Sequence, residues 1–457
     1  MLTNKKRTLI FLCLVISCIA TSMLATALTT ALPLIIKDLA ITTSTGQWLT
    51  SGYSLAMGIA MPLSAFLITR FPTKKLYLSA LGIFLIGTVI AIFAPNFPIL
   101  MVARVFQAVG NGILTSMAQV ILLSIYPKEK LGTVMGWYGL SVTAAPVIAP
   151  TLAGVVVDAY GWRAIFVGIL AIVALSFIVS SFVFADVLET TKKQFDVLSF
   201  AISALAFGGI TLGLGNLGVS PFMSFTVLGC LAIGVIAGIF FVYRQLRLTE
   251  PFLDVRVFSE RTFTLSVIGS MLMYMVMMGS SVIMPIYIQS YLGYSALVSG
   301  LVVLPGSLAM ALVSPLAGRM YDQLGMKKLF IVGSLLLALS SGLMFFVQAQ
   351  TGLWAPVILN LFRSVAIGCL MMPFVTWGTS GLTPKQTAHG TALLTSLRTI
   401  AGAIGSAVFV SVMSVASQAS QLTGVNANMF GLHIAFISMA VIAIILVLLG
   451  VKGVTEK

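Results

Sequence analysis

Three arginines lie inside long apolar stretches of the sequence, where an unpaired charge is costly. Arg104, Arg363 and Arg398 each stand among hydrophobic residues on both sides. A charged side chain at the centre of a bilayer costs at least ~2.5 kcal/mol on insertion scales, so each needs a partner or a water-filled cavity. A guanidinium in such a place can hold an anionic group or keep a nearby carboxylate ionised. These arginines are therefore the first candidates for function, and the alternative is a structural arginine bonded to helix carbonyls.

The acidic residues are distributed differently from the arginines. All 11 Asp and Glu are expected between the apolar stretches or at their ends, and none near the middle. Both histidines stand alone, and the four cysteines lie within apolar stretches. We predict no metal site, no disulfide and no cofactor, because the sequence offers neither ligand clusters nor a phosphate-binding glycine loop. Because a Ser-His-Asp pattern is lacking too, an enzyme is not expected.

The amino-acid composition indicates what kind of protein carries these residues. The chain has 457 residues, of which 59% are hydrophobic and 8% are charged. Soluble domains carry about 25% charged residues, so the surface of this protein must face lipid. The net charge of +14 comes from short clusters between apolar stretches, which argues against a nucleic-acid partner.

Fourteen apolar stretches predict fourteen membrane-spanning helices, because each is about 20 residues long. The first covers 9–36, the fifth 133–157 and the last 430–451. With the N-terminus placed in the cytoplasm, 20 of the 25 Lys and Arg fall on the cytoplasmic side, as the positive-inside rule requires. We therefore predict a multi-pass protein of the all-α class with both termini in the cytoplasm.

Two segments far apart in the chain repeat each other. Tyr53–Leu76 and Gly306–Leu329 share three short matches at one offset of 253 residues. The segments belong to the second and the tenth stretch, so both repeats point the same way through the membrane. We predict a six-helix half over 1–190, two inserted helices with a cytoplasmic linker over 191–262, and a second six-helix half over 263–457.

Several short motifs make the chain similar to one family. They are Ala-Leu-Pro at 31–33, Gln-Trp-Leu-Thr-Ser-Gly-Tyr at 47–53, Arg104 with Gln107 and Gly110, Gly-Trp-Arg at 161–163, and a basic loop in each repeat. In these motifs the chain resembles the major facilitator superfamily and, within it, the fourteen-helix drug:proton antiporter family. The resemblance implies the major facilitator fold, with two six-helix halves plus two inserted helices. It also implies proton-coupled efflux of hydrophobic, drug-like compounds across the cell membrane by alternating access.

The basic loops resemble the family's loop motif, in which glycines and an aspartate precede basic residues. The second copy keeps this pattern at Gly318, Asp322, Gly325 and Lys327. The first copy keeps Arg70 and Lys74, but Thr69 stands where the acid is expected and Pro72 where a glycine is expected. Such a loop can bind a neighbouring helix end by charge and release it during a transport cycle. For the lysines alone, anchoring at the cytoplasmic face is an equally open explanation.

The fifth stretch carries small residues four positions apart, beginning with Ser141 and Ala145. Such spacing lets two helices approach closely, and prolines bend a helix. Pro146, Pro150 and Gly154 belong to this segment, which is similar to the family's antiporter motif with alanine in place of several glycines. Helix packing is what the residues themselves predict, and export by exchange is what the resemblance implies.

Aromatic, methionine and polar residues inside the stretches are candidates for lining a substrate cavity. Methionine adapts to ligands of different shapes, and aromatic rings stack on flat ones. The candidates are Trp48, Tyr53, Gln107, Tyr138, Tyr274, Met278, Arg363, Phe374, Trp377 and Arg398. Ordinary packing is the alternative for most of them. Arg398 stands seven residues into the stretch 391–415 and is expected nearer the cytoplasm than the other two arginines.

Proton exchange requires a group that binds a proton in one state and releases it in another, usually a carboxylate. Asp158 lies about 39 Å along a helix from Gly132, which places it at the outer interface. Arg104, which the resemblance ties to proton coupling, is expected in the outer half too. We predict that Asp158 carries the proton and that Arg104 tunes it, with Asp38 as the second candidate. A plain helix-end acid is the alternative for Asp158.

The substrate class and two other functions stay open. Family members that export lipophilic cations often carry an acid in the first helix, where this chain has Leu24, so neutral, zwitterionic or anionic compounds are favoured over dications. A flippase or exporter of a lipid or anionic amphiphile would use the arginines for the head group. A membrane sensor or enzyme without transport is the third possibility. The expected partners are small hydrophobic or amphiphilic substrates, protons and the lipid bilayer, and the chain is expected to be monomeric.

Overall fold

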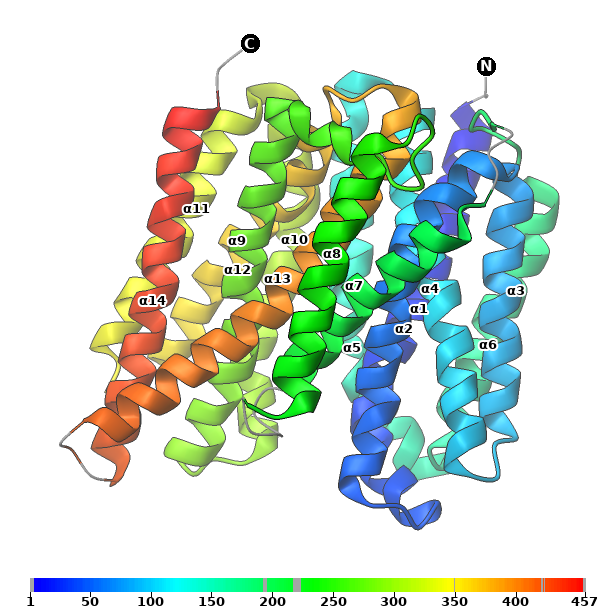
Figure 1. Cartoon of the computed structure of the whole chain (residues 1–457). Coiled ribbons are helices and arrows are strands. Elements are labelled where there is room, and N and C mark those ends of the chain that lie inside the picture. Colours follow the sequence, from blue (N-terminus) through cyan, green and yellow to red (C-terminus); the bar gives the residue numbers. More distant parts are fainter. Residues whose placement is uncertain are drawn as a thin grey trace. The chain divides into compact units, whose positions relative to one another are not determined.

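All regular secondary structure in the described part of the chain is helical (Figure 1), which confirms the predicted all-α class. The computed structural model covers residues 1–457 and describes 4–191, 195–216, 223–348, 350–420, 422 and 424–454. The long helices are α1 (Asn4–Asp38), α2 (Thr43–Arg70), α3 (Thr73–Ile92), α4 (Phe97–Ile125), α5 (Leu131–Tyr160), α6 (Arg163–Val183), α7 (Val197–Gly215), α8 (Cys230–Arg247), α9 (Arg261–Pro285), α10 (Ala296–Leu324), α11 (Met326–Leu343), α12 (Trp354–Thr379), α13 (Pro384–Ala419) and α14 (Gly424–Gly453). Short 3₁₀ or π segments are η1 (Lys128–Lys130), η2 (Phe225–Gly229), η3 (Val255–Ser259), η4 (Ile286–Tyr291) and η5 (Met344–Phe346).

Several residues used above lie outside the described part of the chain. Lys192, Lys193 and Lys457, which entered the charge count, are among them. The side chains of Gln47 and Pro150 are also outside it, although both residues belong to helices.

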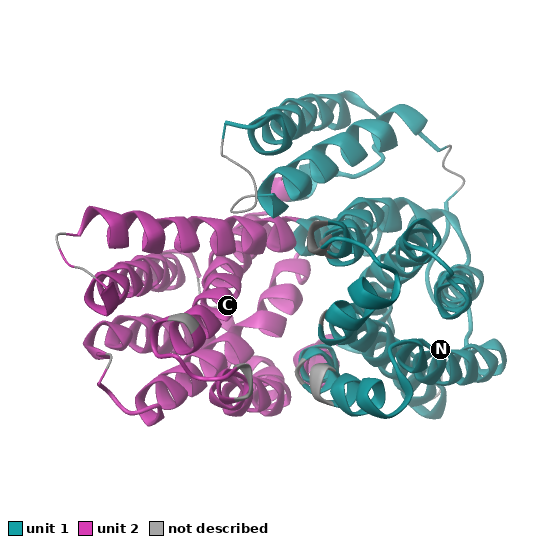
Figure 2. Cartoon of the chain, turned by 90° about the horizontal axis from the view of Figure 1, so that it is seen from below, with its two compact units in different colours: residues 1–127, 141–257, 382–396 teal, residues 128–140, 258–381, 397–457 magenta. Residues whose placement is uncertain are grey.

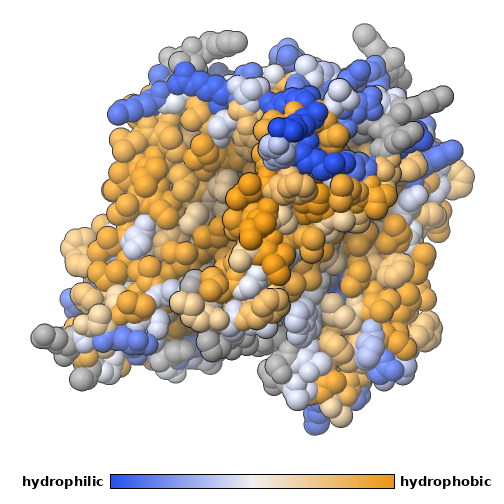
Figure 3. Space-filling model, in the orientation of Figure 1, coloured by the Kyte–Doolittle hydropathy of each residue, from blue (hydrophilic) through white to orange (hydrophobic). Residues whose placement is uncertain are grey.

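Thirteen helices are long and apolar enough to cross a membrane, judged by length and composition over the described residues. The remaining predicted stretch, 133–157, lies within the continuous helix α5. Hydrophobic side chains cover the flanks of the helices, and hydrophilic ones gather near the helix ends (Figure 3). The chain is therefore a multi-pass membrane protein of the predicted fourteen-helix class.

The helices group into two compact units, coloured separately in Figure 2. Unit 1 consists of Met1–Pro127, Ser141–Val257 and Leu382–Ser396, and unit 2 of Lys128–Leu140, Phe258–Gly381 and Leu397–Lys457. Two unit boundaries fall inside helices, so α5 and α13 each contribute to both units. The division into 1–190, 191–262 and 263–457 follows the sequence repeat rather than these contacts, and it stays a prediction.

The packing inside unit 1 recurs inside unit 2. In unit 1, α4 packs against α1, α2 and α3, and α6 packs against α1 and α3. In unit 2, α12 packs against α9, α10 and α11, and α14 packs against α9 and α11. Every pair is shifted by eight helices, as it is in the sequence repeat, where the second stretch corresponds to the tenth. The repeated motifs therefore stand in the same local framework in both units.

The two helices between the repeats form a hairpin on unit 1. α7 packs on α2, where Gly208 lets Leu55 and Ile59 come close. α8 packs on α7, and Gly209 and Gly234 bring the two backbones together. Among the candidate spans found in the described residues, α8 is the least buried at 22% and α4 the most buried at 78%. Most of the α8 surface is therefore available to lipid.

Candidate functional site

Arg104 lies in α4 and is fully buried. The helix begins at Phe97, as expected, so Arg104 is about 10 Å along its axis. The Asn96 side chain caps the helix by accepting a hydrogen bond from the backbone N–H of Ile99 at 3.1 Å. This cap fixes where the helix starts and so where the arginine stands.

The guanidinium of Arg104 is held by three groups. Nη1 donates to Gln107 Oε1 at 3.0 Å, Nε donates to the carbonyl of Leu49 at 3.1 Å, and the central carbon lies 4.1 Å from the centre of the Tyr53 ring. Leu49 and Tyr53 belong to α2, whereas Gln107 is one turn along α4. The Tyr53 hydroxyl accepts a hydrogen bond from Asn111 Nδ2 at 2.8 Å. Two sequence motifs thus form one buried polar cluster in unit 1.

Close packing of α3 against α4 supports this cluster. A Cβ at Gly110 would lie 2.8 Å from the carbonyl oxygen of Ala80, and Gly87 of α3 is in equally close contact with α4. Any larger residue at these positions would push the helices apart. The close approach lets Gln107 Nε2 donate to Thr88 Oγ1 of α3 at 3.5 Å.

Leu49 and Asn111 are members of the cluster that were not predicted. Leu49 acts through its main-chain carbonyl, which leaves no signal in a side-chain pattern. Asn111 stands two turns after Arg104 on the same face of α4. An amide at that spacing within an apolar stretch is a signal that could have identified it.

Asp158 lies exposed near the C-terminal end of α5. The two ion pairs within the described chain involve other residues, so the structure does not join Asp158 to Arg104. The role of Asp158 as proton carrier, and that of Arg104 as its tuner, stay predictions.

Asp38, the second candidate carrier, has a clear structural partner. Its Oδ2 accepts hydrogen bonds from Arg163 Nη1 at 2.7 Å and from Trp162 Nε1 at 3.0 Å. Arg163 Nη2 also donates to the carbonyl of Ala94 at 3.1 Å. The hydrogen bonds from Arg163 and then from Trp162 lower the pKa of the Asp38 carboxyl. Asp38 is therefore kept ionised, and it ties three helix connections of unit 1 together.

Arg363 lies in α12, the helix of unit 2 that corresponds to α4, and is 1% exposed. Nη2 donates to Asn360 Oδ1 at 2.7 Å, and the central carbon lies 5.2 Å from the centre of the Phe436 ring. Nη1 has no hydrogen-bond partner among the described residues, as is also true of Nη2 of Arg104. Arg363 thus makes one hydrogen bond where Arg104 makes two.

Arg398 lies in α13, which begins earlier than predicted. The helix starts at Pro384, because the polar residues before 391 continue it beyond the apolar stretch. Arg398 is therefore about 21 Å from the start of its helix, twice the distance that the predicted start would give.

The Arg398 side chain is 6% exposed, and its central carbon lies 5.2 Å from the centre of the Tyr274 ring. Nε and Nη1 have no hydrogen-bond partner in the part of the chain that the structure describes. Tyr138, in the part of α5 that belongs to unit 2, is fully buried. At Gly402, one turn along α13, a Cβ would lie 2.7 Å from Tyr274 and 2.8 Å from Met278. The structure thus brings together Arg398, Tyr274 and Met278, three predicted cavity residues, within unit 2.

Two other predicted cavity residues pack around Phe330. The ring centre of Phe374 lies 4.8 Å from that of Phe330, and the ring centre of Trp377 lies 6.3 Å from it. The carbonyl of Phe374 accepts a hydrogen bond from Ser266 Oγ at 2.5 Å. These contacts place both residues in the packing of α9, α11 and α12. Trp48 is 43% exposed on α2.

In the second basic loop, Asp322 caps the first turn of α5. Its Oδ1 accepts from the backbone N–H of Gly132, and its Oδ2 from the backbone N–H and the hydroxyl of Thr133, each at 2.7 Å. Gly318, one turn earlier in α10, lies so close to the Gly132 backbone that a Cβ would clash with it. Gly325 ends α10 with a φ of 75°, a conformation that favours glycine. All three motif residues therefore have a defined structural role within unit 2.

In the first basic loop, the helix end is fastened differently. The Thr69 hydroxyl donates to the carbonyl of Phe66 in its own helix at 2.9 Å, and the Thr69 carbonyl accepts from the N–H of Thr191 at 2.8 Å. Asp186 accepts a hydrogen bond from the N–H of Lys74, at the start of α3, at 2.9 Å. This loop is thus bound to the segment that follows α6.

The basic side chains of the loops lie near the helix ends. Arg70 is exposed at the end of α2, and Lys74 and Lys327 are half-buried in the first turns of α3 and α11. Their positions are compatible with both explanations given for them, loop binding and anchoring at the membrane surface.

α5 is one continuous helix through Pro146 and Pro150. Ala145 is buried, and a Cβ at Gly154 would lie 4.0 Å from Thr30 of α1. The small residues of this segment therefore serve helix packing within unit 1.

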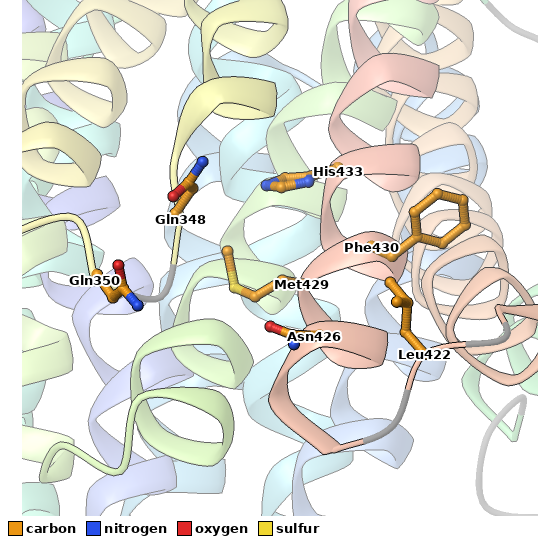
Figure 4. A pocket seen from close by; sticks show the side chains of 7 residues that line it. All are labelled: Gln348, Gln350, Leu422, Asn426, Met429, Phe430 and His433. Carbon is orange, nitrogen blue, oxygen red and sulfur yellow. The ribbon is translucent and has the colours of Figure 1, made fainter.

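A cavity of about 280 Å³ opens elsewhere in unit 2 (Figure 4). It is lined by Gln348, Gln350, Leu422, Asn426, Met429, Phe430 and His433. None of these residues was predicted to act on a substrate. Among the described residues, no three His, Cys, Asp or Glu side chains come together as metal ligands would.

Comparison with known proteins gives the same assignment from several directions. A family model described as Major Facilitator Superfamily matches residues 10–406. The chain is 38% identical over 421 residues to the uncharacterized MFS-type transporter YcnB of Bacillus subtilis (strain 168), covering 92% of this chain and 89% of that protein. It is 37% identical over 396 residues to the lincomycin resistance protein LmrB of the same organism, covering 85% and 82%. It is 27% identical over 385 residues to the multidrug export protein EmrB of Escherichia coli (strain K12), covering 83% and 74%.

Two solved structures share the fold at low sequence identity. The human organic anion transporter MFSD10 matches with a TM-score of 0.70 and 14% identity, covering 98% of this chain and 100% of that one. The proton:xylose symporter XylE matches with a TM-score of 0.65 and 14% identity, covering 100% and 97%. The chain therefore belongs to the Major Facilitator Superfamily, and its relatives confirm the resemblance to the drug:proton antiporters that its motifs predict.

Proposed function

We propose that this protein exports hydrophobic, drug-like compounds across the cell membrane in exchange for protons. The observation that carries the proposal is the pair of fully buried arginines, Arg104 and Arg363, in corresponding helices of the two repeats. Buried charge inside a membrane protein marks a substrate or proton path more often than a structural site. Relatives named for lincomycin resistance and multidrug export support a drug-like substrate.

Growth of a drug-sensitive host on a panel of compounds tests this function. Expression of the wild-type chain is expected to raise the tolerated concentration of several hydrophobic compounds, and Arg104→Ala, expressed at the same level, is expected to remove most of the gain. We expect bis-quaternary dications to be poor substrates. A dication as the best substrate, or no gain for any compound, would contradict the proposal.

In this proposal, Asp322 serves as the conformational latch. A carboxylate at a helix N-terminus is stabilising by about 0.3–2 kcal/mol. An interaction of that size can form in one state and open in another at a modest energetic cost. The cap on α5 therefore forms and breaks once in each transport cycle.

For coupling, we propose Asp158 as the proton carrier and Arg104 as the residue that tunes it. The exposed position of Asp158 allows direct exchange with water. Asp38 ranks second, because its carboxyl must first leave Arg163 before it takes up a proton. Proton flux driven by a drug gradient in liposomes tests the order. Asp158→Asn is expected to abolish the flux, and unchanged coupling in both Asp158→Asn and Asp38→Asn would refute both assignments.

We further propose that both termini and the segment 243–263 face the cytoplasm, as the positive-inside rule favours. Single cysteines can be placed in this segment after Cys13, Cys18, Cys230 and Cys369 are replaced. A membrane-impermeant thiol reagent applied to intact cells is expected to miss them. Ready labelling from outside would show that this segment faces the outside and would contradict the proposed topology.

Export or flipping of an anionic amphiphile is a second candidate function. It is favoured by the arginine donors that have no partner in the described chain, on Arg363 and above all on Arg398.

A further inference from the structure

Arg398 differs from the other two buried arginines in how little the protein satisfies it. Arg104 has two hydrogen bonds and a ring at 4.1 Å, and Arg363 has one hydrogen bond. For Arg398, both Nε and Nη1 lack a hydrogen-bond partner among the described residues, although 94% of the residue is buried, given its 6% exposure. A buried charged group left in this way carries its full desolvation penalty. A ligand that arrives with acceptor atoms would relieve this penalty.

The neighbours of Arg398 within unit 2 set the chemistry of that ligand. Tyr274 presents its aromatic ring to the guanidinium, and Met278 lies next to Tyr274 against α13. Neither ion pair in the described chain involves Arg398, so no carboxylate of this part neutralises it. The surroundings therefore combine one unmatched positive charge with flat and adaptable apolar walls.

Arginine donors bind oxyanions through charge-assisted hydrogen bonds, which are stronger than those between neutral groups. In Arg398, the two donors without a partner among the described residues are Nε and Nη1. They point to different edges of the guanidinium, because Nη1 lies cis to Cδ and the N–H of Nε lies on the side of Nη2. A monovalent oxyanion attached to an aromatic or aliphatic body would supply a charged acceptor to this guanidinium and an apolar body to the walls.

We propose that Arg398, beside Tyr274, binds the oxyanion of an amphiphilic substrate, whose apolar body lies against the Tyr274 ring and Met278. This inference rests on the proposed export function and narrows its substrate class to organic anions. In this inference, the guanidinium of Arg398 contacts the substrate directly.

Two fluorescent probes that differ only at the anion provide the test: pyrenebutyrate and its neutral amide. Binding is followed by fluorescence with the purified full-length protein in detergent, for the wild type, Arg398→Gln and Arg398→Lys. The charged hydrogen bonds predict that Arg398→Gln weakens pyrenebutyrate binding about tenfold or more and changes amide binding less than about twofold. Arg398→Lys, which keeps the charge but has one donor nitrogen instead of three, is expected to weaken pyrenebutyrate binding less than Arg398→Gln does.

The controls separate the possible failures. Thermal unfolding and gel filtration show whether Arg398→Gln is folded. If it is not folded, Arg398→Lys replaces it in the test, and a selective loss of affinity for pyrenebutyrate over the amide is again expected. Equal losses for both probes, or none, would overturn the proposal. A chloride titration shows whether an inorganic anion occupies the site instead. Chloride that binds only when Arg398 is present, yet does not compete with pyrenebutyrate, would also overturn the proposal. If the wild type binds pyrenebutyrate through Arg398 but vesicles transport no compound, the export function fails while the binding site stands.

Discussion

The two basic loops occupy equivalent places in the repeats, yet they hold different partners. In the second, Asp322 of α10 receives three hydrogen bonds from the first turn of α5. In the first, the end of α2 is bound to residues that follow α6, through Thr69 and Thr191. One acid therefore separates a loop that caps a distant helix from a loop that is fastened locally. In the transport cycle proposed above, the second copy would therefore act as a switch and the first as a fixed brace.

The largest effect is expected for Asp322→Ala. The change leaves two backbone N–H groups at the start of α5 without their acceptor, and loss of a cap costs about 0.5–2 kcal/mol. Transport measured in liposomes is expected to fall about tenfold, since each 1.4 kcal/mol corresponds to about tenfold in an equilibrium. Thr69→Ala in the first loop is the matched control and is expected to change transport less than about twofold. Equal losses in the two variants would remove the distinction between the loops.

A smaller effect on transport, but a larger effect on stability, is expected for Gly318→Ala. The added methyl group meets the Gly132 backbone, and overpacking of this kind costs about 1–3 kcal/mol. Transport is expected to fall several-fold, with a lower unfolding temperature. The equivalent position in the first loop is the buried Ala65, where a methyl group is already accommodated. If Gly318→Ala behaves like the wild type, the close contact between α10 and α5 is not required.

Asp186→Ala tests the brace in the first loop. It removes the acceptor for the N–H of Lys74 at the start of α3, which is expected to lower stability by about 1 kcal/mol. Transport by the folded protein is expected to stay within about twofold of wild type, because the brace does not change between states. A loss as large as that of Asp322→Ala would show that the first loop takes part in the switch.

The smallest effect is expected for Thr69→Asp, which restores the family's acid in the first loop. An acid near the C-terminal end of a helix is unfavourable by about 0.3–1 kcal/mol, and position 69 lies in the last turn of α2. Slight destabilisation without a gain in transport is therefore expected. Faster transport in this variant would show that the first copy can still act as a latch.

Much of the fold follows directly from the sequence. Apolar runs of membrane-spanning length leave few alternatives to helices, because a lipid-exposed backbone must satisfy its own hydrogen bonds. The start of α13 was missed because polar residues 384–390 extend a helix beyond its apolar part, which hydropathy alone does not register.

The candidate site was predicted less completely. Gln107 lies one turn from Arg104, so their contact follows from helix geometry. The carbonyl of Leu49 comes from another helix, and only the packed structure shows that it reaches the arginine. Similarly, the sequence predicts that Asp322 meets a helix end but does not identify that end as α5.

The hairpin of α7 and α8 has a consequence for how such chains evolve. An insertion of two crossings preserves the direction in which the following helices traverse the membrane, whereas a single added crossing would invert them. Within the described residues, α7 packs on α2 and α8 packs on α7, so the hairpin adds to unit 1 without interrupting the packing that the two repeats share. The pair is therefore a module whose gain or loss leaves the polarity of the second repeat unchanged.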